Sequence, residues 1–226
     1  MLNELVRAFR MLDEPRVRRV LWLGIGLSLA TLAGLVLSVE GVVSWASNTG
    51  YVWLDRLFEV LGVLGTLVVA WFLFPSVVVA ISGIFLDQVV DATEDRYYPH
   101  LSPPRPAPLG VSVPAALRLL ATALALNLLA LPLYLVPGAN LPAWLLLNGY
   151  LISREYVELV ALRRMSPQAA VELRKRHRLR FWLAGMLIAL LLAVPLLNLV
   201  APIVGAAFLT QRFHRYGSDA TNVIRD

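Results

Sequence analysis

Uncharged stretches of apolar residues alternate with short charged segments along the chain. Residues 20–39 and 60–86 contain no charged side chain. A helix needs about 20 apolar residues to cross the roughly 30 Å hydrocarbon core of a bilayer, and both stretches reach that length. The pattern therefore predicts two long membrane-spanning helices, over residues 20–39 and 60–86.

The last apolar stretch, residues 181–210, is also uncharged but is interrupted in its middle. Pro195, Asn198 and Pro202 lie where a spanning helix would continue with Leu and Val. A proline inside a helix removes a backbone hydrogen bond, at a cost of about 3 kcal/mol. Each arm, 181–194 and 203–210, is too short to cross the core alone. We expect a helix–turn–helix that enters the membrane and returns to the same side.

A second broken stretch, residues 119–152, has a similar layout, with a turn that contains Asn140. Its breaks are expected at Pro132, Pro137 and Pro142. Paired apolar segments with proline interruptions at corresponding places point to a transport site in membrane proteins. The pattern predicts two helical hairpins, 119–152 and 181–210, that penetrate only part of the membrane.

The N-terminal residues 1–19 have the spacing of an amphipathic helix that lies in the membrane interface. Pro15 is expected to break this helix shortly before the first span. The apolar residues that fall at helical spacing are Leu2, Leu5, Val6, Phe9 and Leu12.

Two further polar segments complete the chain. Residues 153–180 are predicted to form basic cytoplasmic helices, the second starting at Ser166 and Pro167, and residues 211–226 to form a polar tail. The predicted fold is an all-α integral membrane protein with one membrane domain, residues 1–226. It contains two long transmembrane helices, two partly penetrating helical hairpins and amphipathic interfacial helices.

Composition supports a membrane protein and narrows its chemistry. The chain is 58% hydrophobic and 15% charged, with a mean hydropathy of +0.70, which is far from the composition of a soluble domain. It contains no cysteine, which excludes disulfides, thiol catalysis and cysteine metal sites. The net charge of +5 flanks apolar segments, so anionic lipid headgroups are a better partner than nucleic acid.

The basic residues also predict the orientation. If both hairpins return to their own side, residues 40–59 are the only segment on the far side, and Arg56 is the only base there. The other nineteen of the twenty Lys and Arg residues then lie on the near side. Because basic residues favour the cytoplasm, both termini are expected to be cytoplasmic. Two complete crossings by the hairpins would move only the 154–180 cluster outward.

Four short motifs are distinctive in the chain: Arg18-Arg19, GIFLDQV at 83–89, YLVPGAN at 134–140 and VPLLNLVAPIVGAA at 194–207. Together they resemble the CysZ family of bacterial inner-membrane sulfate permeases, and the similarity covers about residues 4–215. The resemblance implies two long helices with two part-way hairpins. It also implies an inner-membrane protein that takes up sulfate, or a similar oxyanion, for sulfur assimilation and cysteine biosynthesis.

The candidate anion-binding residues are Arg16, Arg18 and Arg19. In the resembled family a sulfate lies near a Gly-Leu/Ile-Arg-Arg turn at the start of the first long helix, and Arg18 and Arg19 match its two arginines. Arg16 stands where that family has glycine, so it adds a positive side chain instead of a close backbone approach. A helix N-terminus and guanidinium groups both favour tetrahedral oxyanions. The alternative is that these arginines anchor the helix to lipid headgroups.

Asparagines in the hairpins are possible path-lining residues for a hydrated anion. The alternative for each is a hydrogen bond between helices, typically worth about 1 kcal/mol. The residues concerned are Asn127, Asn140, Asn148 and Asn198.

Other polar groups have simpler interpretations. Glu155 and Glu158 are expected to form surface ion pairs with Arg154, and the basic run 163–180 to lie on lipid or solvent. The acidic group at 87–95 is expected to cap the end of a span instead of binding a metal. It consists of Asp87, Asp91, Glu94 and Asp95, and the three histidines, His100, His177 and His214, lack metal-binding spacing.

These features favour transport over catalysis. The chain has no HExxH motif, Walker loop or nucleophile elbow, so we expect neither an enzyme nor a bound cofactor or metal. Neither predicted span contains an ionisable group of the kind that proton coupling requires, which favours channel-like or facilitated flow. Half-crossing hairpins expose turn backbone, so a homo-oligomer is expected. A non-transporting scaffold that shapes one leaflet is the alternative function.

Overall fold

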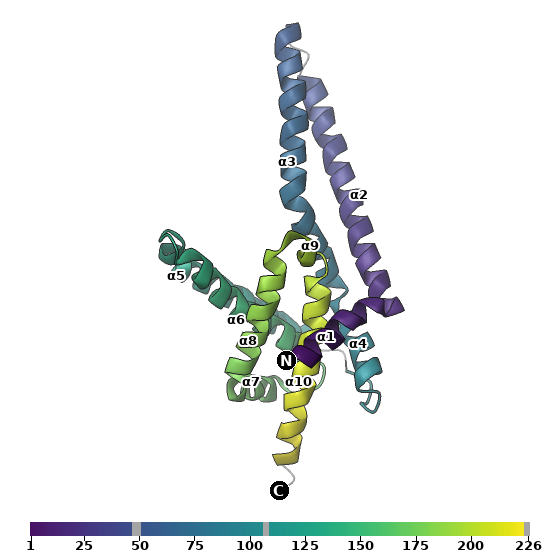
Figure 1. Cartoon of the computed structure of the whole chain (residues 1–226), viewed down its shortest axis with the longest axis vertical. Helices are drawn as coiled ribbons and strands as arrows, with labels where there is room; N and C mark the ends of the chain where they lie inside the picture. Colours follow the sequence, from purple (N-terminus) through teal and green to yellow (C-terminus); the bar gives the residue numbers. More distant parts are fainter. Residues whose placement is uncertain (47–50, 106–108, 224–226) are drawn as a thin grey trace. The chain divides into compact units, whose positions relative to one another are not determined.

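The structure of the protein is a computed structural model that describes residues 1–46, 51–105 and 109–223 (Figure 1). All of the regular elements in these ranges are helices, which confirms the predicted all-α fold. Contacts within the chain divide it into two compact units, Met1–Arg18 with Leu86–Asp226, and Arg19–Phe85. Each unit is described by itself below, and a single membrane domain over residues 1–226 stays a prediction.

The Arg19–Phe85 unit consists of most of α2 (Pro15–Ala46) and of α3 (Val52–Ile84). The segment Pro15–Ser44 is long and apolar enough to cross a membrane, as predicted for residues 20–39. The two helices approach closely near Gly62, where an added Cβ would lie 2.7 Å from Cγ2 of Val43. Helix α3 contains most of the second predicted span, 60–86. The structure does not describe several side chains of α3, and the second span therefore stays a prediction.

The N-terminal segment forms α1 (Leu2–Arg10), the 3-10 turn η1 (Met11–Asp13) and then the start of α2. Helix α1 ends at Arg10 and η1 at Asp13, before the predicted break at Pro15, and Pro15 is instead the first residue of the long helix. Proline suits this position because the first helical N–H has no intrahelical partner. The buried face of α1 consists of Glu4 and Ala8, whereas Leu2 and Val6 are exposed. The predicted apolar stripe therefore remains available to the membrane interface.

The first predicted hairpin consists of α5 (Leu109–Tyr134) and α6 (Asn140–Ala161), and α4 (Leu86–Tyr97) precedes it. The expected breaks at Pro132 and Pro142 are wrong. Pro132 lies inside α5 near its end, and Pro142 is the third residue of α6, where a missing N–H costs little. The turn itself contains Gly138, whose φ of +85° is a left-handed conformation that favours glycine.

The segment Gly110–Tyr134 within α5 is also long and apolar enough to cross a membrane. Helix α6 continues past the predicted end of the hairpin at residue 152 and ends at Ala161. Residues 153–161 therefore belong to the hairpin's second helix, and the first helix expected in the 153–180 segment is part of α6.

The second hairpin consists of α8 (Arg178–Ala193), the short α9 (Pro195–Asn198) and α10 (Ala201–Val223), after α7 (Pro167–Arg176). Helix α8 ends where predicted, because Val194 precedes a proline and is extended at φ −95° and ψ 117°. Helices α8 and α10 lie side by side and α9 joins them at one end (Figure 1). The helix–turn–helix predicted for residues 181–210 is therefore confirmed, although α10 is much longer than the expected arm 203–210.

The core of the larger unit lies around the second hairpin. Every residue from 201 to 213 is buried, so the predicted polar tail, 211–226, is wrong for its first residues. Helices α6 and α8 meet at Gly149 and Gly185, where a Cβ added to Gly185 would lie 1.9 Å from the carbonyl oxygen of Gly149. Ser166 caps α7, as predicted, by accepting a hydrogen bond from the Ala169 N–H at 3.3 Å.

Candidate functional site

The three predicted anion-binding arginines lie inside the first two turns of α2 and not before it, because the helix begins at Pro15. Arg16 donates a hydrogen bond to Asp95 of α4 at 2.7 Å. Both side chains of this pair are about two-thirds exposed, at 67% and 66%, so the ion pair is worth little. Arg16 is therefore engaged with a carboxylate, which competes with any anion.

Arg18 and Arg19 differ from Arg16. Both side chains are exposed, whereas Val17 and Val20 on either side are buried. Among the residues that the structure describes, neither Arg18 nor Arg19 has an ion pair or a side-chain hydrogen bond. These two guanidinium groups, which match the resembled motif, are thus available to a ligand.

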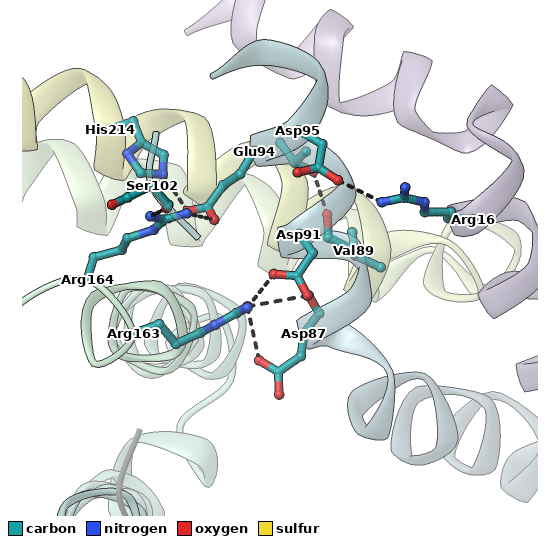
Figure 2. Close-up of polar contacts among 11 residues, drawn as sticks. Arg16, Asp87, Val89, Asp91, Glu94, Asp95, Ser102, Arg163, Arg164 and His214 are labelled. Atoms are coloured by element: carbon teal, nitrogen blue, oxygen red, sulfur yellow. Dashed lines mark hydrogen bonds and ion pairs between the residues drawn. The ribbon is translucent and has the colours of Figure 1, made fainter. Parts of the chain in front are cut away.

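The acidic residues of α4 pair with arginines of the α6–α7 connection (Figure 2). Asp87, Asp91 and Glu94 lie on one face of α4 because they are spaced by four and three residues. Arg163 hydrogen-bonds to Asp87 at 3.4 Å and forms a shorter ion pair with Asp91. Arg164 hydrogen-bonds to both oxygens of Glu94, through Nε to Oε1 at 3.1 Å and through Nη2 to Oε2. The acidic group therefore ties α4 to the α6–α7 connection instead of only capping a span.

Glu94 is the most buried member of this network. His214 of α10 lies 2.7 Å from its Oε1, on the same carboxylate as Arg164. Burial alone would raise the pKa of Glu94, but the hydrogen bonds from His214 and Arg164 outweigh it and lower the pKa below the ordinary value. Glu94 is thus held as a carboxylate and ties α4 to the core helix α10.

A second ion-pair cluster fixes α1 to α10. Glu4 accepts hydrogen bonds from Arg212 at 2.9 Å and from Arg215 at 2.7 Å, and the Met1 amino group lies 3.2 Å away. Burial would raise the pKa of Glu4, but the hydrogen bonds from Arg215 and Arg212 lower it to about 2. Because Arg212 is only 2% exposed, its charge depends on this carboxylate.

A third cluster lies at the base of the first hairpin. Arg154 of α6 donates to Thr122 of α5 at 2.5 Å and to Glu158 at 3.2 Å. Arg174 of α7 donates to the same oxygen of Glu158 at 2.8 Å. Arg154 is a buried residue, so the expectation of surface ion pairs is wrong for it. Glu155 is exposed and, within the described part of the chain, has no such partner.

The predicted path-lining asparagines do not converge on one another in hydrogen bonds. Asn127 and Asn148 each donate to the carbonyl four residues earlier in their own helix, Ala123 and Trp144, at 2.8 Å. These bonds lie within one helix, so for both residues the expected bond between helices is wrong. Asn140 accepts from the Leu141 N–H at 2.8 Å and thereby stabilises the start of α6.

Asn198 is different, because its Oδ1 is buried and unsatisfied among the described residues. It is the last residue of α9, in the break of the second hairpin. A buried amide oxygen without a donor costs free energy unless water or a ligand reaches it. Of the asparagines, Asn198 therefore keeps the strongest case as a path-lining residue.

Basic residues at 163–180 divide into two groups. Arg163, Arg164 and Arg174 are ion-paired as described above, so for these three the expectation of a solvated or lipid-facing run is wrong. Exposed members surround the α7–α8 junction and remain suited to anionic headgroups, namely Lys175, Arg176, Arg178 and Arg180. Within the described residues, no group of three or more His, Asp or Glu side chains has the arrangement of a metal site.

Comparison with known proteins decides the family. The profile of the family described as sulfate transporter CysZ/etoposide-induced protein 2.4 matches residues 4–202. The chain belongs to this family. No curated protein matches the chain. The match covers most of the predicted resemblance over residues 4–215 and includes the whole α2 arginine group. Membership in the CysZ family, together with two helices long enough to cross a bilayer, makes the chain a membrane protein.

Family membership indicates a general class of activity. The family's description names a sulfate transporter and no enzyme, in keeping with a transport-type protein. It also names a second protein that the description does not call a transporter. The anion, the route and the roles of Arg16, Arg18 and Arg19 are therefore matters for proposal.

Sequence reasoning missed the partners of most buried charges. The sequence does not predict the contacts of Glu4, Arg212 and His214, because each meets a residue more than 100 positions away in the chain. One signal was present for α10: Gln211 and Arg212 follow the apolar run without a helix-breaking residue, so the helix had no reason to end at residue 210. For Glu4 the sequence contains no comparable sign.

Proposed function

We propose that this protein mediates the uptake of sulfate, or of a similar oxyanion, across the bacterial inner membrane for sulfur assimilation and cysteine biosynthesis. The observation that carries the proposal is the match to the CysZ family over residues 4–202. Arg18 and Arg19 support it, since both are exposed at the start of a helix that can cross the membrane. A helix N-terminus and two guanidinium forks suit a tetrahedral dianion.

The positions of the charged residues in the first hairpin support a hairpin that penetrates only part of the membrane. Beyond the contact between Thr122 and Arg154, α5 continues to Tyr134 and α6 starts at Asn140. The uncharged part of this helix pair is thus only about 20 Å long at 1.5 Å per residue, shorter than the roughly 30 Å core. Placing Arg154 near the cytoplasmic interface also keeps the basic residues inside, with both termini cytoplasmic.

In the proposed function the anion flows down its own concentration gradient. Residues 20–39 contain no ionisable side chain that could carry a coupling proton. The apolar, exposed face of α5 favours a homo-oligomer in which neighbouring chains or lipid cover the hairpins. Anionic headgroups are the natural partners of the exposed bases around the α7–α8 junction.

Radiolabelled sulfate influx into liposomes tests the proposed site. The double variant Arg18→Ala with Arg19→Ala is expected to lower influx about tenfold or more, because hydrogen bonds to charged groups are strong. The control Arg10→Ala with Arg56→Ala removes the same charge from two exposed positions outside the site and is expected to transport like the wild type. Unchanged influx in the first variant would show that the site is wrong. Deformed vesicles without influx would favour the leaflet-shaping scaffold.

A further inference from the structure

The cluster at the base of the first hairpin has more positive than negative charge. Arg154 and Arg174 both donate to one oxygen of Glu158, Oε1, at 3.2 and 2.8 Å. Two guanidinium groups thus share one carboxylate. By contrast, Arg163 contacts two carboxylates, Asp87 and Asp91.

Burial makes this excess charge significant. The Arg154 side chain is 11% exposed, and those of Arg174 and Glu158 are 20% and 19% exposed. A charge removed from water is stabilised only by a close counter-charge and by hydrogen bonds to all of its donors. One carboxylate cannot neutralise two guanidinium groups, so the cluster favours a further anion.

Donors remain for such an anion. Among the described residues, Nη2 of Arg154 and Nη2 of Arg174 have no acceptor. Thr122 accepts from Arg154 and donates its own proton to the carbonyl of Arg118 at 2.6 Å, so it fixes the guanidinium of Arg154. Arg118 is exposed one turn earlier, on the same face of α5 as Thr122.

We propose that Arg154 and Arg174 form a second binding site for a tetrahedral oxyanion, with Arg118 at its rim and Thr122 positioning Arg154. Guanidinium groups bind the oxygens of sulfate and of phosphate in the same forked geometry. The ligand is therefore free sulfate or the phosphate of a lipid headgroup. Free sulfate at this site rests on the proposed function, since the anion would pass the base of the hairpin on its route.

The test measures equilibrium binding of radiolabelled sulfate to the purified full chain, in the wild-type background and in the Arg18→Ala, Arg19→Ala background. Arg174→Gln is expected to weaken binding about tenfold in the second background, because a charge-assisted hydrogen bond is lost. Glu158→Gln is expected to tighten binding, because it removes the competing carboxylate. Arg10→Gln, at an exposed position of α1 that is unpaired among the described residues, is the matched control and should bind like its parent.

The opposite signs separate a binding site from a structural ion pair. If the cluster only stabilises the fold, Arg174→Gln and Glu158→Gln both lower the melting temperature, and neither changes the binding of sulfate or of phosphatidylglycerol. That result would overturn the proposal. Melting is followed by tryptophan fluorescence, so a variant that fails to fold is recognised, and Arg118→Gln at the exposed rim then provides a second, milder variant with the same expected direction.

A parallel measurement identifies the source of the oxyanion. Native mass spectrometry counts phosphatidylglycerol bound to each variant. Loss of sulfate alone in Arg174→Gln assigns the site to the free anion, and loss of phosphatidylglycerol alone assigns it to a headgroup. Retention of both ligands would overturn the site. Wild-type influx tests the proposed function separately. If influx occurs but the binding of neither sulfate nor phosphatidylglycerol depends on Arg174, only this site is rejected. If binding depends on Arg174 but no influx occurs, only transport is rejected.

Discussion

The two hairpins have a similar layout in sequence but differ in how they pack. In the second hairpin, every residue of α10 from 201 to 213 is buried, and Ile188 and Ala189 of α8 are buried with it. In the first hairpin, few side chains of the segment Gly110–Tyr134 are buried. Leucines such as Leu128 and Leu129 of α5 are exposed instead. The second hairpin is therefore the core of its unit together with α6, whereas α5 of the first hairpin presents an apolar face to its surroundings.

Small residues account for the difference. Gly185 and Gly149 let α8 and α6 approach until backbone meets backbone, and Gly205 of α10 lies close to Ile188. Such close approach is how membrane helices gain packing energy, since lipid tails are as apolar as leucine. Gly110 of α5 has open space around it. Apolar composition alone therefore does not tell a packed helix from an exposed one, whereas closely approached glycines such as Gly149 and Gly185 mark the packed helices.

The strongest test of this comparison is a side chain placed between α6 and α8. Gly185→Val is expected to destabilise the protein by roughly 3 kcal/mol or more, because overpacking against a backbone oxygen forces the helices apart. Thermal unfolding in detergent, followed by tryptophan fluorescence, measures it. Gly110→Ala in α5 is the control and should melt like the wild type. Equal melting of the two variants would contradict the close contact.

The second test separates α10 from its partner at the N-terminus. Glu4→Gln is expected to cost roughly 3 kcal/mol, because it leaves the buried guanidinium of Arg212 without its carboxylate. Combining it with Arg212→Met should recover much of that loss. Urea unfolding of the two single variants and the double variant gives the coupling free energy between Glu4 and Arg212. Additive losses would show that Glu4 and Arg212 do not interact.

The third test uses pH on the same contact. The pKa of Glu4 is lowered from 4.5 to about 2 in the fold, so its contribution to stability is complete above pH 4.5 and is lost as the pH falls toward 2. By pH 3 the loss amounts to about 2 kcal/mol. The melting temperature between pH 6 and pH 3 measures it. Glu4→Gln should show a flatter profile, and an equally steep one would assign the pH dependence to other carboxylates.

The smallest effect is expected on the outer face of α5. Leu128→Ala should change the free energy of unfolding by less than about 0.5 kcal/mol, because the side chain is already exposed. The same truncation at Ile188, which is buried in the second hairpin, should cost about 3 kcal/mol. Light scattering of Leu128→Asn in detergent then asks whether this face joins chains, and a smaller particle than the wild type is expected.

Much of the fold follows from the sequence because apolar runs and prolines are local signals. The absence of charge over residues 20–39 predicts a span that the structure contains in α2, and the Val194-Pro195 pair predicts the end of α8. The prediction at Pro132 was wrong because α5 accommodates proline inside the helix, at Pro114 as well as at Pro132, and continues to Tyr134. The prediction of a polar tail from residue 211 was wrong because Gln211 and Arg212 are polar but buried.

The candidate site was less predictable, for a physical reason. Arg18 and Arg19 are adjacent in the chain, so a motif can reveal them. The partners of Arg154, Arg163 and Arg212 lie on other helices, and pairing across helices leaves no periodic trace in a single sequence. A charged residue in a basic run therefore looks solvated until the fold places Glu158, Asp91 or Glu4 beside it.

The most direct test of the account is the time course of sulfate entry into liposomes that contain only this protein, driven by a sulfate gradient. The account predicts entry well above that of empty vesicles, ending when the two sides are equal, and the same course with a protonophore present. Entry no faster than in empty vesicles, in liposomes shown to contain folded protein, would contradict it.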